Sequence, residues 1–317
     1  MEAPELARQF GLGGAPRLSD GPVARGRQGE VWRLTPSDGV WAVKTSFHPR
    51  READVEPATR FQEAARVAGV PTPAVRRTTD GRVLATVGAA VVRVFDWVDL
   101  RPPDPLMDPA MVGTVLAALH QVHDDGAGGP PDPWSHSPVG ADRWDDLLGR
   151  LRAGGAPFAD RLAALRHELV ALESWLEPPR TLRTCHRDLW ADNLLPTAAG
   201  GVCVIDWEEA GPADPSHELG AVLFEFARTD PGRVRQLTAA YRGVGGPGEV
   251  TGPGHLTMLI AQLGHITETA AEDWLRPNVR SPDRTDSAAW VAEVLDEPHT
   301  REVLQSLLDA ARGPTSH

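Results

Sequence analysis

The strongest constraint on the fold is a change of residue pattern near residue 100. Before it, short β-branched and apolar runs alternate with turns that contain Gly or Pro, as in a sheet. After it, the apolar residues follow the spacing of amphipathic helices. Residues 96–105 (DWVDLRPPDP) separate the two patterns as a linker. We therefore expect an α+β protein with a small β-rich N-terminal lobe at residues 1–96 and a larger helical C-terminal lobe at residues 97–317.

The two patterns also predict individual elements. The first predicts one helix at residues 54–68 and strands at residues 23–25, 30–34, 40–45, 83–86 and 90–95. The second predicts helices at residues 109–123, 142–151, 158–176, 218–229, 234–241, 255–274, 287–295 and 300–312. Residues 181–206 interrupt these helices with a loop and a strand at 202–205, and the Gly- and Pro-rich run at 124–133 is a predicted loop.

The composition singles out two residues. Of the 32 basic residues, 31 are arginine and only Lys44 is lysine. Asparagine is nearly as rare and occurs only as Asn193 and Asn278. A chain so strongly biased against these two residue types is expected to keep them where a substitute fails. Lys44 and Asn193 are therefore candidate functional residues.

Charge and hydropathy narrow the class of partner. The net charge of −12 argues against nucleic acid, because no surplus of basic residues exists to neutralise phosphates. It is compatible with a cationic ligand, or simply with solubility. The chain shows neither a signal peptide nor an 18-residue apolar run, so we expect no membrane span. Cys185 and Cys203 lack metal-site spacing, and a reducing, cytoplasmic location is expected.

Residues 185–195 (CHRDLWADNLL) carry the chemistry. They contain H-R-D-x-x-x-x-N, and Asp206 follows Asn193 by thirteen residues at the end of a short apolar strand. Phosphoryl transfer needs oxygen ligands for Mg²⁺ and a separate carboxylate that orients the incoming hydroxyl group. Asn193 and Asp206 suit the metal, and Asp188 suits the base. The alternative is that Asp188 caps a turn and Asn193 fills a loop position.

These residues resemble those of the aminoglycoside phosphotransferase and choline kinase-like family, whose members are relatives of the protein kinases. The resemblance extends over about residues 20–275. It implies a bilobal protein-kinase-like fold, the cofactors ATP and Mg²⁺, Asp188 as catalytic base, and Asn193 and Asp206 as magnesium ligands. Residues 207–215 (WEEAGPADP) depart from D-F-G and leave no room for a long activation segment, so we expect a small-molecule substrate. Asp214 resembles a family aspartate with a structural role.

A nucleotide-binding loop is also predicted, although its motif matches less completely than the H-R-D-x-x-x-x-N segment does. Residues 24–31 (ARGRQGEV) match G-x-G-x-x-G-x-V, except that Ala24 replaces the first glycine. Gly26 and Gly29 would let the backbone of a hairpin approach phosphates, where a Cβ atom would obstruct it. A plain hairpin turn is the alternative.

Lys44 strengthens the nucleotide hypothesis. It ends the run WAVK, which resembles the V-A-I-K signature, and by that resemblance it would hold the α- and β-phosphates of ATP. Such a lysine needs an acidic partner on the following helix. Glu63 is the preferred candidate and Glu56 is the rival. Main-chain groups near residues 95–98 are expected to meet the adenine.

Acidic side chains gather where the acceptor is expected. The candidates for substrate binding are Asp192, Glu208, Glu268 and Glu272, with Glu209 and Asp273 beside them. His265, Glu268 and Glu272 share one helical face. Facing a cleft, these acids would suit a polyamine; facing outward, they would form a solvated surface. His120 and His123 suggest zinc but lack a third ligand, so His120 is expected to be a packed histidine.

The sequence thus predicts an ATP-dependent O-phosphotransferase that acts on a small hydroxylated molecule. We expect the protein to have neither a nucleic-acid nor a membrane partner. An aminoglycoside-type antibiotic is the first candidate acceptor, which would make the protein a resistance factor. A metabolite such as an amino alcohol, a sugar or a vitamin is the second. A nucleotide-binding pseudokinase that scaffolds partners is a third reading, although all four catalytic-type residues are intact. The sequence does not distinguish ATP from GTP.

Overall fold

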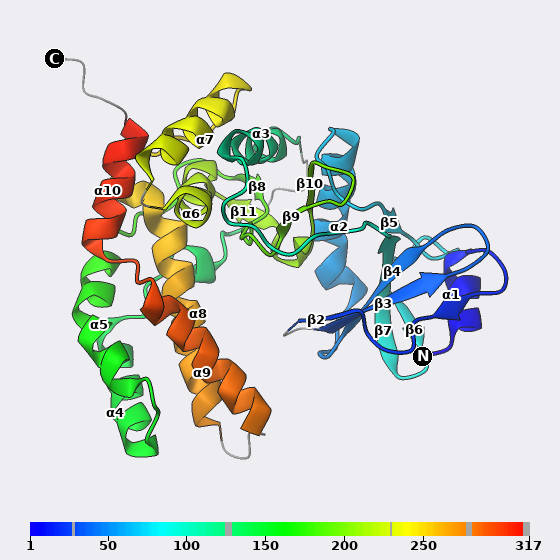
Figure 1. The fold of residues 1–317 in the computed structure, drawn as a ribbon, viewed down its shortest axis with the longest axis horizontal. Helices are drawn as coiled ribbons and strands as arrows, with labels where there is room; N and C mark the ends of the chain where they lie inside the picture. Colours follow the sequence, from blue (N-terminus) through cyan, green and yellow to red (C-terminus); the bar gives the residue numbers. More distant parts are fainter. Residues whose placement is uncertain (27–28, 124–128, 229, 277–280, 313–317) are drawn as a thin grey trace. The chain divides into compact units, whose positions relative to one another are not determined.

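The structure is a computed structural model that describes residues 1–26, 29–123, 129–228, 230–276 and 281–312. Its chain divides into two compact units (Figure 1). The first comprises Met1–Asp104, Val122–Gly126 and Asp188–Gly211, and the second comprises Pro105–Gln121, Ala127–Arg187 and Pro212–His317. The segment Asp188–Gly211, which contains the candidate catalytic residues, therefore belongs to the same unit as the N-terminal strands. The predicted division between residues 96 and 97 stays a prediction.

An antiparallel sheet lies in the first unit (Figure 1). Its central order is β1-β3-β4-β7-β5, and β2 pairs with β3 while β6 pairs with β7. The strands are β1 (Arg17–Leu18), β2 (Ala24–Arg25), β3 (Gly29–Thr35), β4 (Trp41–Ser46), β5 (Val75–Arg76), β6 (Ala85–Val87) and β7 (Ala90–Asp96). The helices are α1 (Ala3–Phe10) and α2 (Glu52–Val67). The short elements α1, β1 and β5 were not predicted, because two-residue strands and an eight-residue helix carry little periodicity.

The two faces of the sheet differ in chemistry. Val43, Val92 and Val94 pack with Leu6 and Phe10 of α1 in one apolar cluster. Side chains alternate along a strand, so their neighbours Lys44 and Arg93 point to the opposite face. Lys44 of β4 and Arg93 of β7 are direct partners in the register, which places two cations side by side. Val55 of α2 packs against Val83 and Leu84, with Val91 of β7 beside this cluster.

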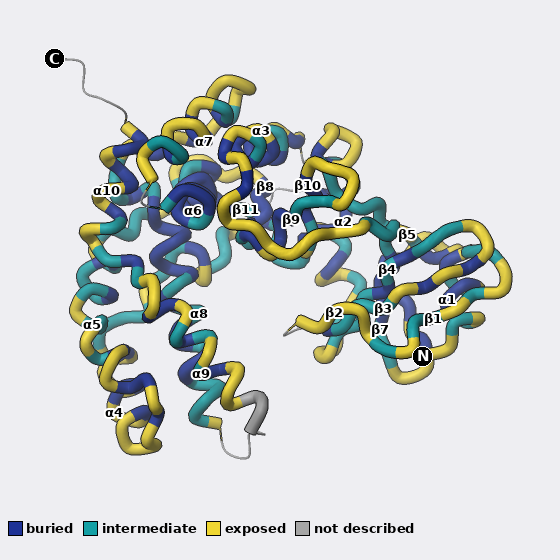
Figure 2. The backbone as a smooth tube through the Cα atoms, viewed as in Figure 1, coloured by how far each residue is buried: buried dark blue, intermediate teal, exposed yellow. Residues whose placement is uncertain are grey.

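Helices make up most of the second unit. They are α3 (Pro109–His120), α4 (Ala141–Gly154), α5 (Ala159–Glu173), α6 (Pro215–Ala227), α7 (Pro231–Gly243), α8 (Thr257–Leu275), α9 (Ser281–Asp296) and α10 (Arg301–Arg312). Figure 2 shows α6 buried along most of its length, and α6 contacts α3, α7 and α8. Each of these helices was predicted in the part of the chain that the structure describes, with ends that differ by up to three residues, except that α9 begins six residues earlier than predicted. Among the described residues, no helix is both long enough and apolar enough to cross a membrane.

Candidate active site

A β-hairpin brings the predicted metal ligands together. Strand β9 (Leu194–Pro196) pairs with β10 (Val202–Val204), and Leu194 lies opposite Val204. The pairing continues by one step, because Ile205 donates its backbone N–H to the carbonyl group of Asn193 at 2.9 Å. Asn193 and Asp206 therefore flank the open end of the hairpin. The thirteen-residue spacing in the sequence is the length of this hairpin.

Asn193 is oriented by Asp188. The side-chain amide of Asn193 donates to the Asp188 carboxylate and to the Asp188 carbonyl group, both at 2.8 Å. Its amino group is thus used within the loop, and the amide oxygen is the atom that remains suited to a hard cation. Asn193 is buried, which limits the rotation of the amide.

Asp188 lies in an acidic and partly buried environment. Burial raises its pKa to about 8, and the negative charge of Asp206 contributes in the same direction. Asp192 and Glu209 add to this effect, whereas the hydrogen bond from Asn193 opposes it. A carboxyl group with a pKa near neutrality is suited to accept a proton from a hydroxyl group.

Lys44 lies directly beside Asp206, the candidate metal ligand that carries a carboxylate. Its ammonium group is 2.8 Å from Asp206 Oδ1, within the first unit. Burial opposes the charge, but the carboxylates of Asp206 and Glu208 outweigh it and raise the pKa of Lys44. Asp206 itself has a left-handed backbone with φ of 58°, which is uncommon for a residue other than glycine. Backbone conformations of this kind concentrate at functional sites.

The predicted ion pair between Lys44 and Glu63 is wrong for this structure. Glu63 binds Arg77 through two hydrogen bonds of 2.9 Å, and the rival Glu56 binds Arg77 at 3.0 Å. The two glutamates are seven residues apart on α2, so they share one helical face. Thr59 lies between them on the same side of α2, and its hydroxyl group accepts a hydrogen bond of 3.1 Å from Arg93.

Glu208 takes the place that Glu63 was expected to fill. Its carboxylate lies 2.8 Å from the Lys44 ammonium group, 3.0 Å from Arg50 and 3.4 Å from Arg93. The same side chains line a small pocket together with the apolar residues Val55, Leu84 and Val91. Glu208 was expected to bind a cationic acceptor, but these cations already occupy it. The sequence did point to Glu208, because it lies two residues after Asp206, but we assigned Glu208 to acceptor binding rather than to Lys44.

The glycine-rich hairpin forms as predicted between β2 and β3. Gly26 donates its N–H to the Gly29 carbonyl at 3.0 Å, while Arg27 and Gln28 lie outside the described residues. A Cβ atom on Gly29 would overlap the Thr45 carbonyl oxygen of β4, so the sheet itself requires this glycine. A Cβ atom on Gly26 would meet nothing within 4 Å. Packing therefore does not explain Gly26.

A buried carboxylate fixes the backbone that leads into Asp188. Glu218 of α6 accepts hydrogen bonds from the backbone N–H groups of His186, at 3.3 Å, and Arg187. The Arg187 carbonyl accepts from the Gln262 side chain of α8. These contacts hold Arg187 in a left-handed conformation with φ of 65°. The strained residue directly before the candidate base is thus held from both sides.

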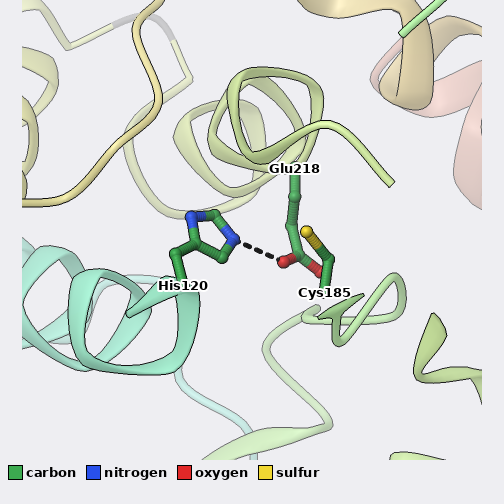
Figure 3. A group of neighbouring side chains, drawn as sticks. All are labelled: His120, Cys185 and Glu218. Atoms are coloured by element: carbon green, nitrogen blue, oxygen red, sulfur yellow. Dashed lines mark hydrogen bonds and ion pairs between the residues drawn. The ribbon is translucent and has the colours of Figure 1, made fainter. Parts of the chain in front are cut away.

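Figure 3 shows Glu218 together with His120 of α3 and Cys185 of β8 (Arg183–Cys185). His120 Nε2 lies 2.7 Å from Glu218, and His120 Nδ1 lies 2.8 Å from the Tyr241 hydroxyl group. Three such residues could hold a metal ion. However, both ring nitrogens of His120 already have partners, and burial raises the pKa of the Cys185 thiol well above its ordinary value. His120 is therefore a packed histidine, as predicted.

The acidic residues of α8 do not form an open cation site. Glu268 is buried and pairs with Arg143 of α4, and its second oxygen lies 3.5 Å from His265. Glu272 pairs with Arg150 of α4. Arginines of the neighbouring helix neutralise both carboxylates, so neither is free for a polyamine. Glu268 is also enclosed rather than solvated, whereas Glu272 forms a partly exposed ion pair. Asp192 is exposed in the first unit.

Asp214 has the structural role that was predicted. It caps the N-terminus of α6 by accepting a hydrogen bond from the Ser216 N–H at 2.9 Å. Its other oxygen accepts from the N–H groups of Arg180 and Thr181.

Cys185 and Cys203 are free and buried.

Comparison with solved structures identifies the fold. A spectinomycin phosphotransferase, APH(9)-Ia, in complex with ADP and spectinomycin superposes with a TM-score of 0.69 at 12% identity, covering 97% of both chains. An aminoglycoside phosphotransferase from Alicyclobacillus acidocaldarius gives 0.60 at 20% identity, covering 91% of this chain and 90% of that one. A microcompartment-associated aminopropanol kinase gives 0.59 at 18% identity, covering 97% and 98%. No curated protein matches the chain.

The fold is kinase-like, and the class of protein that matches the chain is a phosphotransferase. Residues 21–252 match the sequence model of the phosphotransferase enzyme family, APH. Because this match covers more than half of the chain, the protein belongs to that family. The pseudokinase reading therefore loses its support.

Proposed function

We propose that the protein transfers the γ-phosphoryl group of ATP to a hydroxyl group of a small molecule. The observation that carries this proposal is the approach of the only lysine, Lys44, to Asp206 at the open end of the β9–β10 hairpin. That arrangement gathers a cation for phosphates, two oxygen-bearing ligands and a base within the first unit.

Each residue has one proposed role. Asp188 accepts the proton of the acceptor hydroxyl group, with its pKa raised to about 8 by burial. Lys44 binds the phosphates, and Gly26 leaves room for the backbone to approach them. The carboxylate of Asp206 and the amide oxygen of Asn193 fit Mg²⁺, which prefers oxygen ligands. When bound, Mg²⁺ would neutralise the charge that develops on the phosphates.

The acceptor class rests on the relatives. A spectinomycin phosphotransferase and an aminopropanol kinase share the fold, and both of their named acceptors carry amino and hydroxyl groups. An aminoglycoside-type antibiotic is our first candidate, and an amino alcohol is the second. Since Glu208, Glu268 and Glu272 are paired with cations, Asp192 is the remaining carboxylate that we propose for an acceptor amine.

The test is ADP release in the presence of ATP and Mg²⁺ across a panel that includes spectinomycin, other amino sugars and aminopropanol. Asp188→Asn should lower the turnover of any active acceptor by roughly 10²–10⁴-fold, which is the range for loss of a general base. Affinity for nucleotide should change little. Full activity in Asp188→Asn would contradict the assigned base, and wild-type inactivity on every acceptor would contradict the proposed substrate classes.

A further inference from the structure

The ammonium group of Lys44 has two carboxylate partners at equal distance. Asp206 Oδ1 and Glu208 Oε1 each lie 2.8 Å from Nζ. The two acids have different surroundings, because the Asp206 side chain is 40% exposed and the Glu208 side chain is only 10% exposed. One partner is thus open to a ligand, and the other is enclosed.

We propose that Glu208 is the positioning residue that keeps Lys44 directed at the phosphates once Asp206 is engaged by the metal. This inference rests on the proposed function and replaces the role expected of Glu63. Glu208 does not touch the reacting atoms. It acts through Lys44.

The register of the sheet explains why such a residue is needed. Lys44 and Arg93 are direct cross-strand partners, and like charges in that position repel each other. Glu208 Oε1 lies 2.8 Å from Lys44 and 3.4 Å from Arg93, so one oxygen atom bridges both cations. Without it, Lys44 would turn away from Arg93 and toward Asp206 or solvent.

Glu208 is held firmly by its neighbours. It lies in the 3₁₀ turn Trp207–Glu209. The buried indole of Trp207 donates to Thr72 at 2.9 Å and packs edge-on against Phe61 of α2, with a centroid distance of 5.7 Å. Arg50 binds the second carboxylate oxygen of Glu208 at 3.0 Å. The turn that carries Asp206 is therefore anchored to α2, and Glu208 stays beside Lys44.

Helix α2 cannot supply the same carboxylate in this structure. Its two candidate glutamates both bind Arg77 instead. Val55 and Thr59, which approach the cationic pair, are both buried. Thr59 binds Arg93, so α2 touches the cationic pair through a hydroxyl group rather than through a charge.

The main test measures the binding of MgADP by calorimetry. Glu208→Gln keeps the shape of the side chain but removes its charge, and the dissociation constant should rise roughly tenfold or more, as expected for loss of a charged partner. Glu63→Gln should stay within about twofold of the wild type, because Glu63 serves Arg77. Glu208→Asp should recover part of the affinity, since it restores the charge.

A second readout follows the Lys44 side chain itself. Lys44 is the only lysine in the chain, so selective ¹⁵N-lysine labelling gives a single side-chain amine signal. With MgADP bound, this signal should persist in the wild type and in Glu63→Gln, because an ion-paired ammonium group exchanges its protons slowly. It should broaden or disappear in Glu208→Gln. A role limited to folding stability would not change the signal in a folded variant.

A double-mutant cycle completes the test. In a Lys44→Met background, Glu208→Gln should cause no further loss of MgADP affinity, because its effect passes through Lys44. Wild-type affinity in Glu208→Gln, or a tenfold loss in Glu63→Gln, would overturn the inference. If the wild type binds MgADP but phosphorylates nothing, the proposed function fails while the test of Glu208 still holds. If Glu208→Gln does not fold, Glu208→Asp and the labelled lysine decide the outcome.

Discussion

The hydroxyl group of Tyr241 connects two buried polar groups, the backbone N–H of Gly248 and the imidazole ring of His120. Tyr241 is the only tyrosine in the chain. Its hydroxyl group accepts a hydrogen bond from the Gly248 N–H at 2.8 Å and lies 2.8 Å from His120 Nδ1. The Nε2 atom of the same imidazole lies 2.7 Å from Glu218, so His120 connects Tyr241 to that carboxylate. Glu218 holds the backbone of Arg187, so this chain of contacts ends beside the candidate base.

Tyr241→Phe should destabilise the protein by about 1–3 kcal/mol, because it leaves the His120 ring nitrogen and the Gly248 N–H buried and unpaired. The measurement is urea unfolding followed by circular dichroism. Turnover should also fall, whereas KM for ATP should not change. Unchanged stability would mean that water replaces the hydroxyl group.

At the scale of elements, two features depend on close approach between backbones. The hairpin β9–β10 places Asn193 beside Asp206 through local pairing alone. The contact between α3 and α7 depends instead on Gly113, where a Cβ atom would overlap the Leu237 carbonyl oxygen. A glycine inside a helix costs about 1 kcal/mol relative to alanine, so its presence here reflects this packing.

Gly113→Ala should therefore destabilise the protein by about 1–3 kcal/mol, since the clash with a backbone atom outweighs the gain in helix propensity. Gly149 of α4 provides the matched control, because a Cβ atom there meets nothing within 4 Å. Gly149→Ala should stabilise by up to about 1 kcal/mol. Thermal unfolding of both variants should show shifts of opposite sign, and equal shifts would contradict the packing argument.

For the whole molecule, acid stability depends on buried histidines as well as on carboxylates. His299 is 1% exposed, and burial lowers its pKa to about 4. Burial likewise lowers the pKa of His217 to about 4. Between pH 6.5 and 4 the unfolded chain binds protons at these sites that the folded chain does not bind. Their contribution to stability is thus present above pH 6.5 and is lost as the pH falls to about 4.

His299→Gln should flatten the pH dependence of the free energy of unfolding between pH 6.5 and 4. The contribution removed is about 3 kcal/mol, because burial lowers the pKa of His299 from 6.5 to about 4. Asp188 has the opposite slope throughout this range because its pKa is raised from 3.8 to about 8, so the difference between variant and wild type is the informative quantity. An identical slope would show that the imidazole of His299 titrates normally.

The helices and the longer strands follow from the periodicity of the residues, which is a local property of the chain. Residues 194–196 were expected to be a loop, so the β9–β10 hairpin that brings Asn193 to Asp206 was not predicted, although both residues were candidate metal ligands. The scarcity of lysine also pointed to Lys44, which lies beside Asp206 in the structure.

The pairing of charges depends on contacts between segments that are distant in the sequence. Glu63 fails as the partner of Lys44 because Arg77 pairs with that glutamate. The acids of α8 are paired for a similar reason, since α4 presents arginines to them. The rotation of a helix depends on its whole packed face, and ion pairs form over a few ångströms between distant segments. Local residue patterns determine neither the rotation of a helix nor its distant ion-pair partners. Glu208 could therefore be identified as the enclosed partner of Lys44 only from the fold.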